Sequence, residues 1–261
     1  MTTMEVRNLV KDFAVRSGLR RSKLRAVDDV SFTLEAGRTL GLVGESGSGK
    51  STVARLIARL DRPSSGTISV SDRERSYRDV VQMVFQDPFA SLNPVHTVAH
   101  HLARPLLLHG RARRGADVEQ QVENLLDRVN LLPAAEIARR RPHELSGGQR
   151  QRVAIARALA PGAEVIIADE PVSMLDVSIR LGVLGLLSRL QREENLAVLY
   201  ITHDLATARH FSDEVLVMHR GRIVERGPSD DVLVRPQDPY TRRLAAAAPN
   251  PESRFSLGGQ P

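Results

Sequence analysis

The chain has 261 residues, a formal net charge of +6 and no cysteine. This length can bury a large core without disulfides, and the missing cysteines exclude thiolate metal sites and cysteine-ligated iron–sulfur clusters. The first residues lack the basic-then-apolar pattern of a signal peptide, and no apolar run approaches the roughly 18 residues of a membrane-spanning helix. We therefore expect a soluble chain that meets a membrane only through a partner.

The positive charge suggests a nucleic-acid partner as one interpretation. The basic residues are spread along the chain, however, with a dense run only at 16–25, and there are six Phe, three Tyr and no Trp. So few aromatic side chains argue against stacking platforms for single strands. We predict that the basic run is a solvated hairpin tip, with contact to nucleic acid or anionic lipid as the alternative, and we expect no direct nucleic-acid partner.

The first elements alternate apolar and polar residues at the period of a strand. Residues 4–13 predict an edge strand, and residues 26–34 predict a second strand. The apolar residues 39–43 predict a buried strand, and residues 53–60 have the spacing of a helix.

The segment between this strand and this helix is the most informative part of the chain. Residues 44–52 read Gly-Glu-Ser-Gly-Ser-Gly-Lys-Ser-Thr, which is the G-x-x-x-x-G-K-[ST] spacing of a phosphate-binding loop. The strand–loop–helix setting favours that function over a Gly/Ser-rich surface turn. Inward-pointing backbone N–H groups and the helix N-terminus would hold phosphate oxygens. The predicted contact residues are Gly44, Glu45, Ser46, Gly47, Ser48, Gly49, Lys50, Ser51 and Thr52.

Two side chains of this loop have separate predicted roles. Lys50 can reach the outer phosphates, and the Ser51 hydroxyl can bind Mg²⁺.

The rest of the chain continues to alternate strands and helices. Residues 94–159 predict a mainly helical block. The Pro-rich stretch at the C-terminus is expected to lie over the surface. The other predicted elements are strands at 67–70, 80–85, 164–169 and 196–202, an amphipathic helix at 177–190, and a closing hairpin at 214–218 and 222–225. Such alternation implies an α/β fold with a mainly parallel sheet.

Two adjacent carboxylates, Asp169 and Glu170, end the strand predicted at 164–169. Open α/β sheets bind ligands at such strand ends, although an apolar run that ends in Asp-Glu is often only structural. Asp169 would hold Mg²⁺, and Glu170 would orient or deprotonate an attacking water.

A second anion-binding corner is predicted at Leu145-Ser-Gly-Gly-Gln149, which precedes a run of strong helix formers. Ser and Gly at a helix start leave backbone N–H groups available to an anion. An ordinary helix cap is the alternative, because Ser146 would also cap well. The position shortly before the carboxylate strand favours the binding site.

Five features follow one another along the chain: the phosphate loop, Gln86, Leu-Ser-Gly-Gly-Gln, Asp169-Glu170 and His203. In this order they resemble the nucleotide-binding subunit of an ABC transporter, and the resemblance covers nearly the whole chain. The resemblance implies the P-loop NTPase fold of an ABC ATPase. In that fold, a mainly parallel core sheet has an antiparallel β subdomain and an inserted helical subdomain.

The resemblance also predicts how the chain is divided. We expect an ABC ATPase domain over 1–235, with the helical subdomain inserted at 94–160, and a Pro-rich C-terminal extension over 236–261. The stretch 66–82 is shorter than the family usually has, which predicts a trimmed antiparallel subdomain.

The resemblance implies a head-to-tail dimer that holds two ATP molecules, with Mg²⁺, between its subunits. Each site would combine the phosphate loop of one chain with the Ser-Gly-Gly corner of the other. The residues that would contact ATP in the opposite site are Ser146, Gly147, Gly148, Gln149 and Asp176. The family more often has Ala where Met174 stands, and we expect little effect from this difference.

Four further roles follow from the resemblance. Glu170 would be the catalytic base, and Gln86 would bind Mg²⁺ and sense the transmembrane partner. His203 matches the switch histidine, which can donate a hydrogen bond to the γ-phosphate or to the attacking water. Phe13 is the candidate for stacking on adenine, with a core aromatic as the alternative.

Two segments resemble the importer branch for dipeptides, oligopeptides and nickel. Residues 84–94 read Val-Phe-Gln-Asp-Pro-Phe-Ala-Ser-Leu-Asn-Pro, and residues 169–178 read Asp-Glu-Pro-Val-Ser-Met-Leu-Asp-Val-Ser. Residues 236–244 are similar to the C-terminal extension of that branch, and the details favour its second, F-type ATPase subunit. Without cysteine, the cysteine-rich cluster that some relatives have in this tail cannot exist here.

The implied function is ATP hydrolysis coupled to the import of di- or oligopeptides. The implied partners are a second ABC ATPase subunit, identical or homologous, two membrane permeases and an extracytoplasmic solute-binding protein. They would place the chain at the cytoplasmic face of the cell membrane. A nickel or other small-solute importer and a phosphonate-lyase-like enzyme complex stay open as alternatives. A soluble ABC ATPase that acts on DNA or ribosomes is disfavoured, because zinc modules, a second ATPase half and coiled-coil insertions are missing from the sequence.

Overall fold

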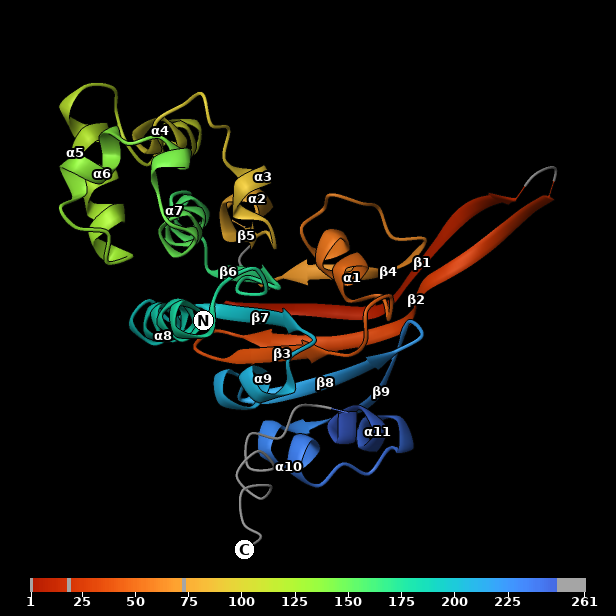
Figure 1. Ribbon diagram of the computed structural model, residues 1–261. Helices are drawn as coiled ribbons and strands as arrows, with labels where there is room; N and C mark the ends of the chain where they lie inside the picture. The colour runs from red at the N-terminus through yellow and green to blue at the C-terminus, as the bar shows by residue number, and fades with distance from the viewer. Residues whose placement is uncertain (1, 18–19, 72–73, 248–261) are drawn as a thin grey trace, which may run out of the picture.

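The computed structural model describes residues 2–17, 20–71 and 74–247. Two sheets lie at the centre of the molecule, and a group of helices projects from one end of the larger sheet (Figure 1). Within these residue ranges, no helix combines the length and the hydropathy that a membrane span needs.

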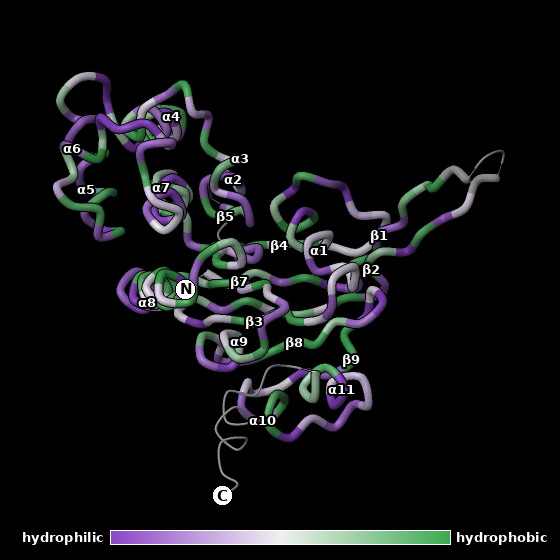
Figure 2. Tube along the Cα trace, in the orientation of Figure 1, coloured by the Kyte–Doolittle hydropathy of each residue, from purple (hydrophilic) through white to green (hydrophobic). Residues whose placement is uncertain are grey.

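The larger sheet forms the centre of the fold. Its strands, within the described residues, lie in the spatial order β5 (Val81–Val84), β6 (Val165–Asp169), β7 (Ala197–Thr202), β3 (Thr39–Val43), β8 (Glu214–His219) and β9 (Arg222–Pro228). Neighbours from β5 to β8 pair in parallel, and β9 runs antiparallel to β8. Every residue of β3, β6 and β7 is buried, and Figure 2 shows hydrophobic residues concentrated along these strands. Strands buried on both faces are continuous apolar runs, which explains why the sequence predicts them well.

The smaller sheet is antiparallel, with β1 (Thr3–Ser17) between β2 (Arg20–Glu35) and β4 (Ser65–Val70). The prediction of an edge strand at 4–13 is therefore wrong, because β4 pairs with the free side of β1. Alternation of apolar and polar residues reports one buried face and cannot distinguish a central from an edge strand.

The hairpin predicted around the basic run is confirmed. Strands β1 and β2 continue past the body of the molecule as a long arm (Figure 1), and Ser17 pairs with Arg20 near its end. The tip itself, at 18–19, lies outside the described residues.

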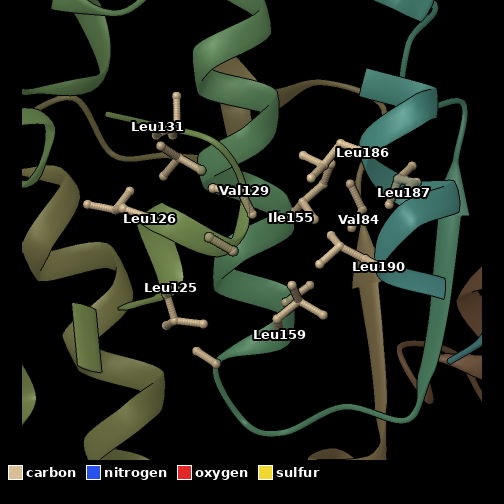
Figure 3. Close-up of a cluster of buried hydrophobic side chains, with 14 of the residues drawn as sticks. Val84, Leu125, Leu126, Val129, Leu131, Ile155, Leu159, Leu186, Leu187 and Leu190 are labelled. Atoms are coloured by element: carbon tan, nitrogen blue, oxygen red, sulfur yellow. The ribbon is translucent and has the colours of Figure 1, made fainter. Parts of the chain in front are cut away.

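The predicted helical block is also confirmed. Its helices are α4 (Val98–Leu108), α5 (Ala116–Arg128), α6 (Ala134–Arg139) and α7 (Gly147–Leu159), with a 3₁₀ turn at Pro142–Glu144. The short helix α3 (Pro88–Ser91) precedes the predicted block. Figure 3 shows Ile155 of α7 between Leu126 of α5 and Leu186 of α8 (Val177–Glu193). One continuous buried cluster contains these residues and Val84 of β5. The second half of α7 is therefore packed in the same core as the larger sheet.

Among the remaining helices, α1 (Lys50–Ile57) shares one buried cluster with strands of both sheets, and α9 (Leu205–Phe211) contacts β3 and β7. Helix α1 follows β3, and the short α2 (Tyr77–Val80) precedes β5. Beyond β7, the chain forms α9, α10 (Ser229–Val234) and α11 (Pro239–Ala247).

The C-terminal stretch differs from the expectation of a chain that only covers the surface. Helices α10 and α11 contribute buried Val232 and Tyr240 to a hydrophobic cluster with Val43 and Val217 of the larger sheet. The expectation is therefore wrong for 229–247, because apolar side chains spaced along these short helices reach the core. Residues 248–261 lie outside the described part of the chain.

Candidate functional site

The segments that follow β3, β5, β6 and β7 meet at one edge of the larger sheet, because these strands are parallel and end on the same side. A cleft of about 730 Å³ lies there. Its lining comprises Phe13, Leu24, Ala26, Gly44, Glu45, Ser46, Gly47, Gly49, Lys50, Ser51, Thr52, Gln86, Glu170, His203 and Leu244. The fold thus brings the phosphate loop together with predicted residues from four other segments, namely Phe13, Gln86, Glu170 and His203.

The phosphate loop depends on glycine at two close approaches. Gly49 has φ +109°, and a Cβ there would lie 2.3 Å from the Ala26 carbonyl oxygen. Gly44 has φ +151°, and its Cβ would lie 2.2 Å from the Met218 carbonyl oxygen. Any larger residue would strain the backbone and displace a neighbouring strand. The loop ends at the N-terminus of α1, where backbone N–H groups are available to an anion.

Lys50 is folded back onto the loop. Its Nζ donates hydrogen bonds to the carbonyl oxygens of Gly44 at 2.8 Å and Glu45 at 2.9 Å, and only 5% of the residue is exposed. Burial lowers the pKa of the Lys50 ammonium, and the nearby Glu170 and Asp169 carboxylates oppose this shift. A buried cation beside a cleft favours an anionic ligand such as phosphate.

Ser48 is the one predicted phosphate-loop residue missing from the lining among the described residues. It is 5% exposed, its N–H donates to the Glu45 carbonyl at 3.2 Å, and its own carbonyl accepts from Gly221 N at 2.9 Å. In this structure Ser48 therefore holds the loop in shape and ties it to the turn between β8 and β9.

The Ser51 hydroxyl donates to Asp169 Oδ1 at 3.3 Å. Asp169 is 7% exposed, and burial raises the pKa of its carboxyl group, with a further contribution from the adjacent Glu170. A hydroxyl, a carboxylate and the amide of Gln86 form a set of oxygen donors at this edge. Such donors fit Mg²⁺, which proteins usually hold through one or two carboxylates together with substrate phosphates.

The Glu170 carboxylate lies between two other predicted site residues. His203 Nδ1 is 3.0 Å from Glu170 Oε1, and Gln86 Nε2 donates to Glu170 Oε2 at 3.1 Å. Glu170 has φ +45°, a left-handed conformation that is uncommon for a residue other than glycine. Its N–H donates to the Ile201 carbonyl at 2.9 Å, which fixes this turn at the end of β6. Backbone conformations of this kind concentrate at functional sites.

The Ser146 corner forms a separate surface. Ser146 Oγ accepts from Gln149 N at 3.2 Å, and Ser146 N donates to Gln149 Oε1 at 2.9 Å, which makes a capping box at the start of α7. A Cβ on Gly148 would lie 2.4 Å from Ile179 Cγ2, so the corner packs closely against the first turn of α8, which follows the exposed Asp176. Within the described residues, none of the residues predicted to act on the opposite site lines the cleft of its own chain.

Four residues near the cleft escaped prediction: Leu24, Ala26, Tyr240 and Leu244. Leu24 and Ala26 are on β2, opposite the predicted Phe13 on β1, which is 37% exposed in the lining. Leu244 lies on α11, and the Tyr240 hydroxyl accepts a hydrogen bond from Glu45 N at 3.1 Å. The segment 236–244 is recognised as similar to the C-terminal extension of the importer branch. Nothing in its own sequence indicates that it contacts the phosphate loop.

Comparisons with known proteins show the family and the fold of the chain. The family model described as ABC transporter matches residues 27–173. The chain is 45% identical over 269 residues to the oligopeptide transport ATP-binding protein AppF of Bacillus subtilis, covering 98% of this chain and 81% of AppF. It is 48% identical over 258 residues to the glutathione import ATP-binding protein GsiA of Pectobacterium atrosepticum, covering 94% of this chain. It spans only 41% of that relative's length.

A solved structure supports the fold class predicted from the sequence. The dimeric post-hydrolysis state of the ATP-binding cassette MJ0796, bound to ADP and Pi, matches with a TM-score of 0.72 and 29% identity, over 87% of this chain and 98% of that one. The names of AppF and GsiA confirm the resemblance to the peptide-importer branch. The chain belongs to the ABC transporter family, as an ATP-binding protein with the ABC ATPase fold.

Proposed function

We propose that the chain hydrolyses ATP at a dimer interface and couples hydrolysis to the import of peptides through partner permeases. The observation that carries the proposal is the Glu170 carboxylate, held between Gln86 and His203 in the same cleft as the phosphate loop. The named functions of the relatives, oligopeptide transport for AppF and glutathione import for GsiA, support a small peptide as the solute.

In the proposed reaction, water attacks the γ-phosphorus in line with the leaving oxygen. Glu170 orients the water and accepts its proton, and His203 donates a hydrogen bond to the γ-phosphate or to the water. Lys50 and the N–H groups at the start of α1 stabilise negative charge on the phosphate oxygens. Phe13 stacks on the adenine. Bound Mg²⁺, for which Ser51, Asp169 and Gln86 offer oxygen donors, would neutralise further phosphate charge.

The second half of each site would come from another ATPase subunit, either a copy of this chain or a homologue. The exposed corner of that subunit would supply the N–H groups and hydroxyl of Ser146, Gly147, Gly148 and Gln149, and Asp176 would lie between the two sites. This arrangement explains why one chain has two anion-binding corners that belong to different surfaces.

The remaining partners follow from the same proposal. Segments near Gln86 and in the helical subdomain, inserted at 94–160, would transmit closure and reopening of the dimer to two permeases. A solute-binding protein would deliver the peptide from outside, and the chain would lie at the cytoplasmic face of the membrane. The ATPase domain would extend over 1–235 and the C-terminal extension over 236–261.

The test is ATP hydrolysis by the purified chain as a function of its concentration, with Glu170→Gln as the control. Turnover per chain that rises steeply with concentration supports competent homodimers. Tight Mg-ATP binding without turnover supports a heterologous second ATPase, which should then co-purify with membrane permeases. Absence of Mg-ATP binding would contradict the proposal, and co-purification with soluble lyase subunits would replace transport with a different function.

A further inference from the structure

The C-terminal helix α11 contacts the phosphate loop directly. Glu45 N donates a hydrogen bond to the Tyr240 hydroxyl at 3.1 Å. The carbonyl of the same Glu45 accepts from Lys50 Nζ at 2.9 Å and from Ser48 N at 3.2 Å. Tyr240 therefore belongs to the same hydrogen-bond network as Lys50, the proposed phosphate contact.

Tyr240 is held in a defined place. The residue is 6% exposed, and its ring packs on the His219 ring with 3.8 Å between centroids. The Asp238 carboxylate accepts from Tyr240 N at 2.7 Å and caps α11. Glu225 of β9 accepts from Gln237 N at 2.8 Å and from Asp238 N at 3.1 Å, which fixes the start of the helix beside the sheet (Figure 1). The hydroxyl thus meets the loop from a rigid support.

One helical turn after Tyr240, Leu244 lies on the same side of α11 and lines the cleft. The other apolar side chains of the lining are Phe13, Leu24 and Ala26 from the β1–β2 hairpin. Helix α11 therefore contacts the site in two ways. The Tyr240 hydroxyl accepts a hydrogen bond from the phosphate loop, and Leu244 lines the cleft together with Phe13, the predicted adenine contact.

We propose that α11 is a part of the nucleotide site, in which Tyr240 is a positioning residue for the phosphate loop and Leu244 completes the apolar wall that receives the base. The inference rests on the proposed function, because it requires that this cleft binds ATP. A loop held in its binding shape before the ligand arrives loses less conformational freedom on binding, so removal of the Tyr240 hydroxyl weakens affinity for the phosphates.

The experiment measures equilibrium affinity for Mg-ATP and for inorganic tripolyphosphate, which has no base, in a Glu170→Gln background that prevents turnover. Tyr240→Phe removes only the hydroxyl and keeps the ring on His219. It should weaken both ligands by the same factor, about threefold to tenfold, as expected for one lost hydrogen bond. Leu244→Ala should weaken Mg-ATP several-fold and leave tripolyphosphate unchanged.

Thr241 offers a matched control on the same helix. Its side chain is fully buried, and its hydroxyl has no hydrogen-bond partner within the described residues. Thr241→Val also removes one hydroxyl from α11 but touches no loop atom, so it should leave both affinities unchanged. Hydrogen exchange of the 44–52 backbone gives an independent readout, which should become faster in Tyr240→Phe and stay unchanged in Thr241→Val.

The outcomes separate the two proposals. If the Glu170→Gln parent, which carries no change in α11, binds neither ligand, the proposed function is overturned. The role of Tyr240 alone is overturned if that parent binds both ligands and Tyr240→Phe does not differ from Thr241→Val. The comparison covers ligand affinity and the rate of hydrogen exchange in the 44–52 backbone. Equal losses of Mg-ATP and tripolyphosphate affinity in Leu244→Ala overturn the assignment of Leu244 to the base.

Discussion

The phosphate loop and the Ser146 corner are both helix N-termini with glycine and serine, yet the chain completes only one of them. The loop lies in a cleft with a buried ammonium, from Lys50, and a carboxylate, from Glu170. The corner is exposed at Ser146, and its hydrogen-bonding side chains satisfy each other in a capping box. The same free N–H groups at a helix start are therefore found in two different surroundings, and we propose that the phosphate loop binds ATP within its own chain while the Ser146 corner contacts the phosphates of another subunit.

The largest expected effect is on turnover after Glu170→Gln. The substitution keeps the shape and both neighbours of the side chain but removes its capacity to accept a proton. Steady-state ATP hydrolysis should fall by about 10²- to 10⁴-fold, the usual contribution of a general base. Mg-ATP affinity should be retained, and loss of binding together with turnover would show instead that Glu170 acts on the ground state.

Gly49→Ala tests whether the close approach of the phosphate loop to Ala26 requires glycine at position 49. A Cβ at φ +109° and 2.3 Å from the Ala26 carbonyl forces a shift of β2 or of the loop. We expect a loss of about 1–3 kcal/mol in unfolding free energy, measured by chemical denaturation. The control is Gly47→Ala, where φ is +80° but no atom lies within 4 Å of the added Cβ. Equal losses in both variants would assign the effect to backbone conformation alone.

Asp169→Asn should affect folding stability and Mg²⁺ dependence in opposite directions. Because burial raises the pKa of Asp169 above its value in the unfolded chain, the buried carboxylate lowers folding stability at neutral pH. The variant should therefore melt at a higher temperature than wild type near pH 7. This advantage should shrink as the pH falls and should vanish once the carboxyl is protonated in both folded and unfolded states. Its ATPase activity should need more Mg²⁺, whereas unchanged Mg²⁺ dependence would remove Asp169 from the metal site.

Met174→Ala is expected to have the smallest effect. Met174 is 55% exposed beside the Asp176 loop, and exposed substitutions usually change stability by less than about 0.5 kcal/mol. Melting temperature and ATP turnover at saturating chain concentration should both stay close to wild type. A large loss of turnover with unchanged melting would place Met174 in the contact between subunits.

The meeting of Glu170 and His203 could be predicted because it follows from the geometry of the sheet. Residues at the carboxyl ends of adjacent parallel strands must converge, so Glu170 and His203 meet although 33 residues separate them. The phosphate loop could be predicted for a different reason, because its glycines and the start of its helix are contiguous in the sequence.

The missed features depend on contacts between distant segments. Nothing in residues 4–13 distinguishes a central from an edge strand until β4 pairs with them. Likewise, Tyr240 reaches Glu45 only after β8, β9 and α10 have set the position of α11. Long-range packing of this kind leaves no periodic pattern within the segment itself.

The Mg-ATP affinity of the dilute, monomeric chain shows whether the phosphate loop binds ATP within its own chain while the Ser146 corner acts on a partner. Lys50→Ala and Ser146→Arg would be compared with wild type in this assay. We predict that Lys50→Ala abolishes measurable binding, whereas Ser146→Arg binds as wild type does and loses only turnover in the assembled dimer. If Ser146→Arg weakened binding by the monomer as much as Lys50→Ala, the Ser146 corner would belong to the site of its own chain, which would contradict its proposed role on a partner.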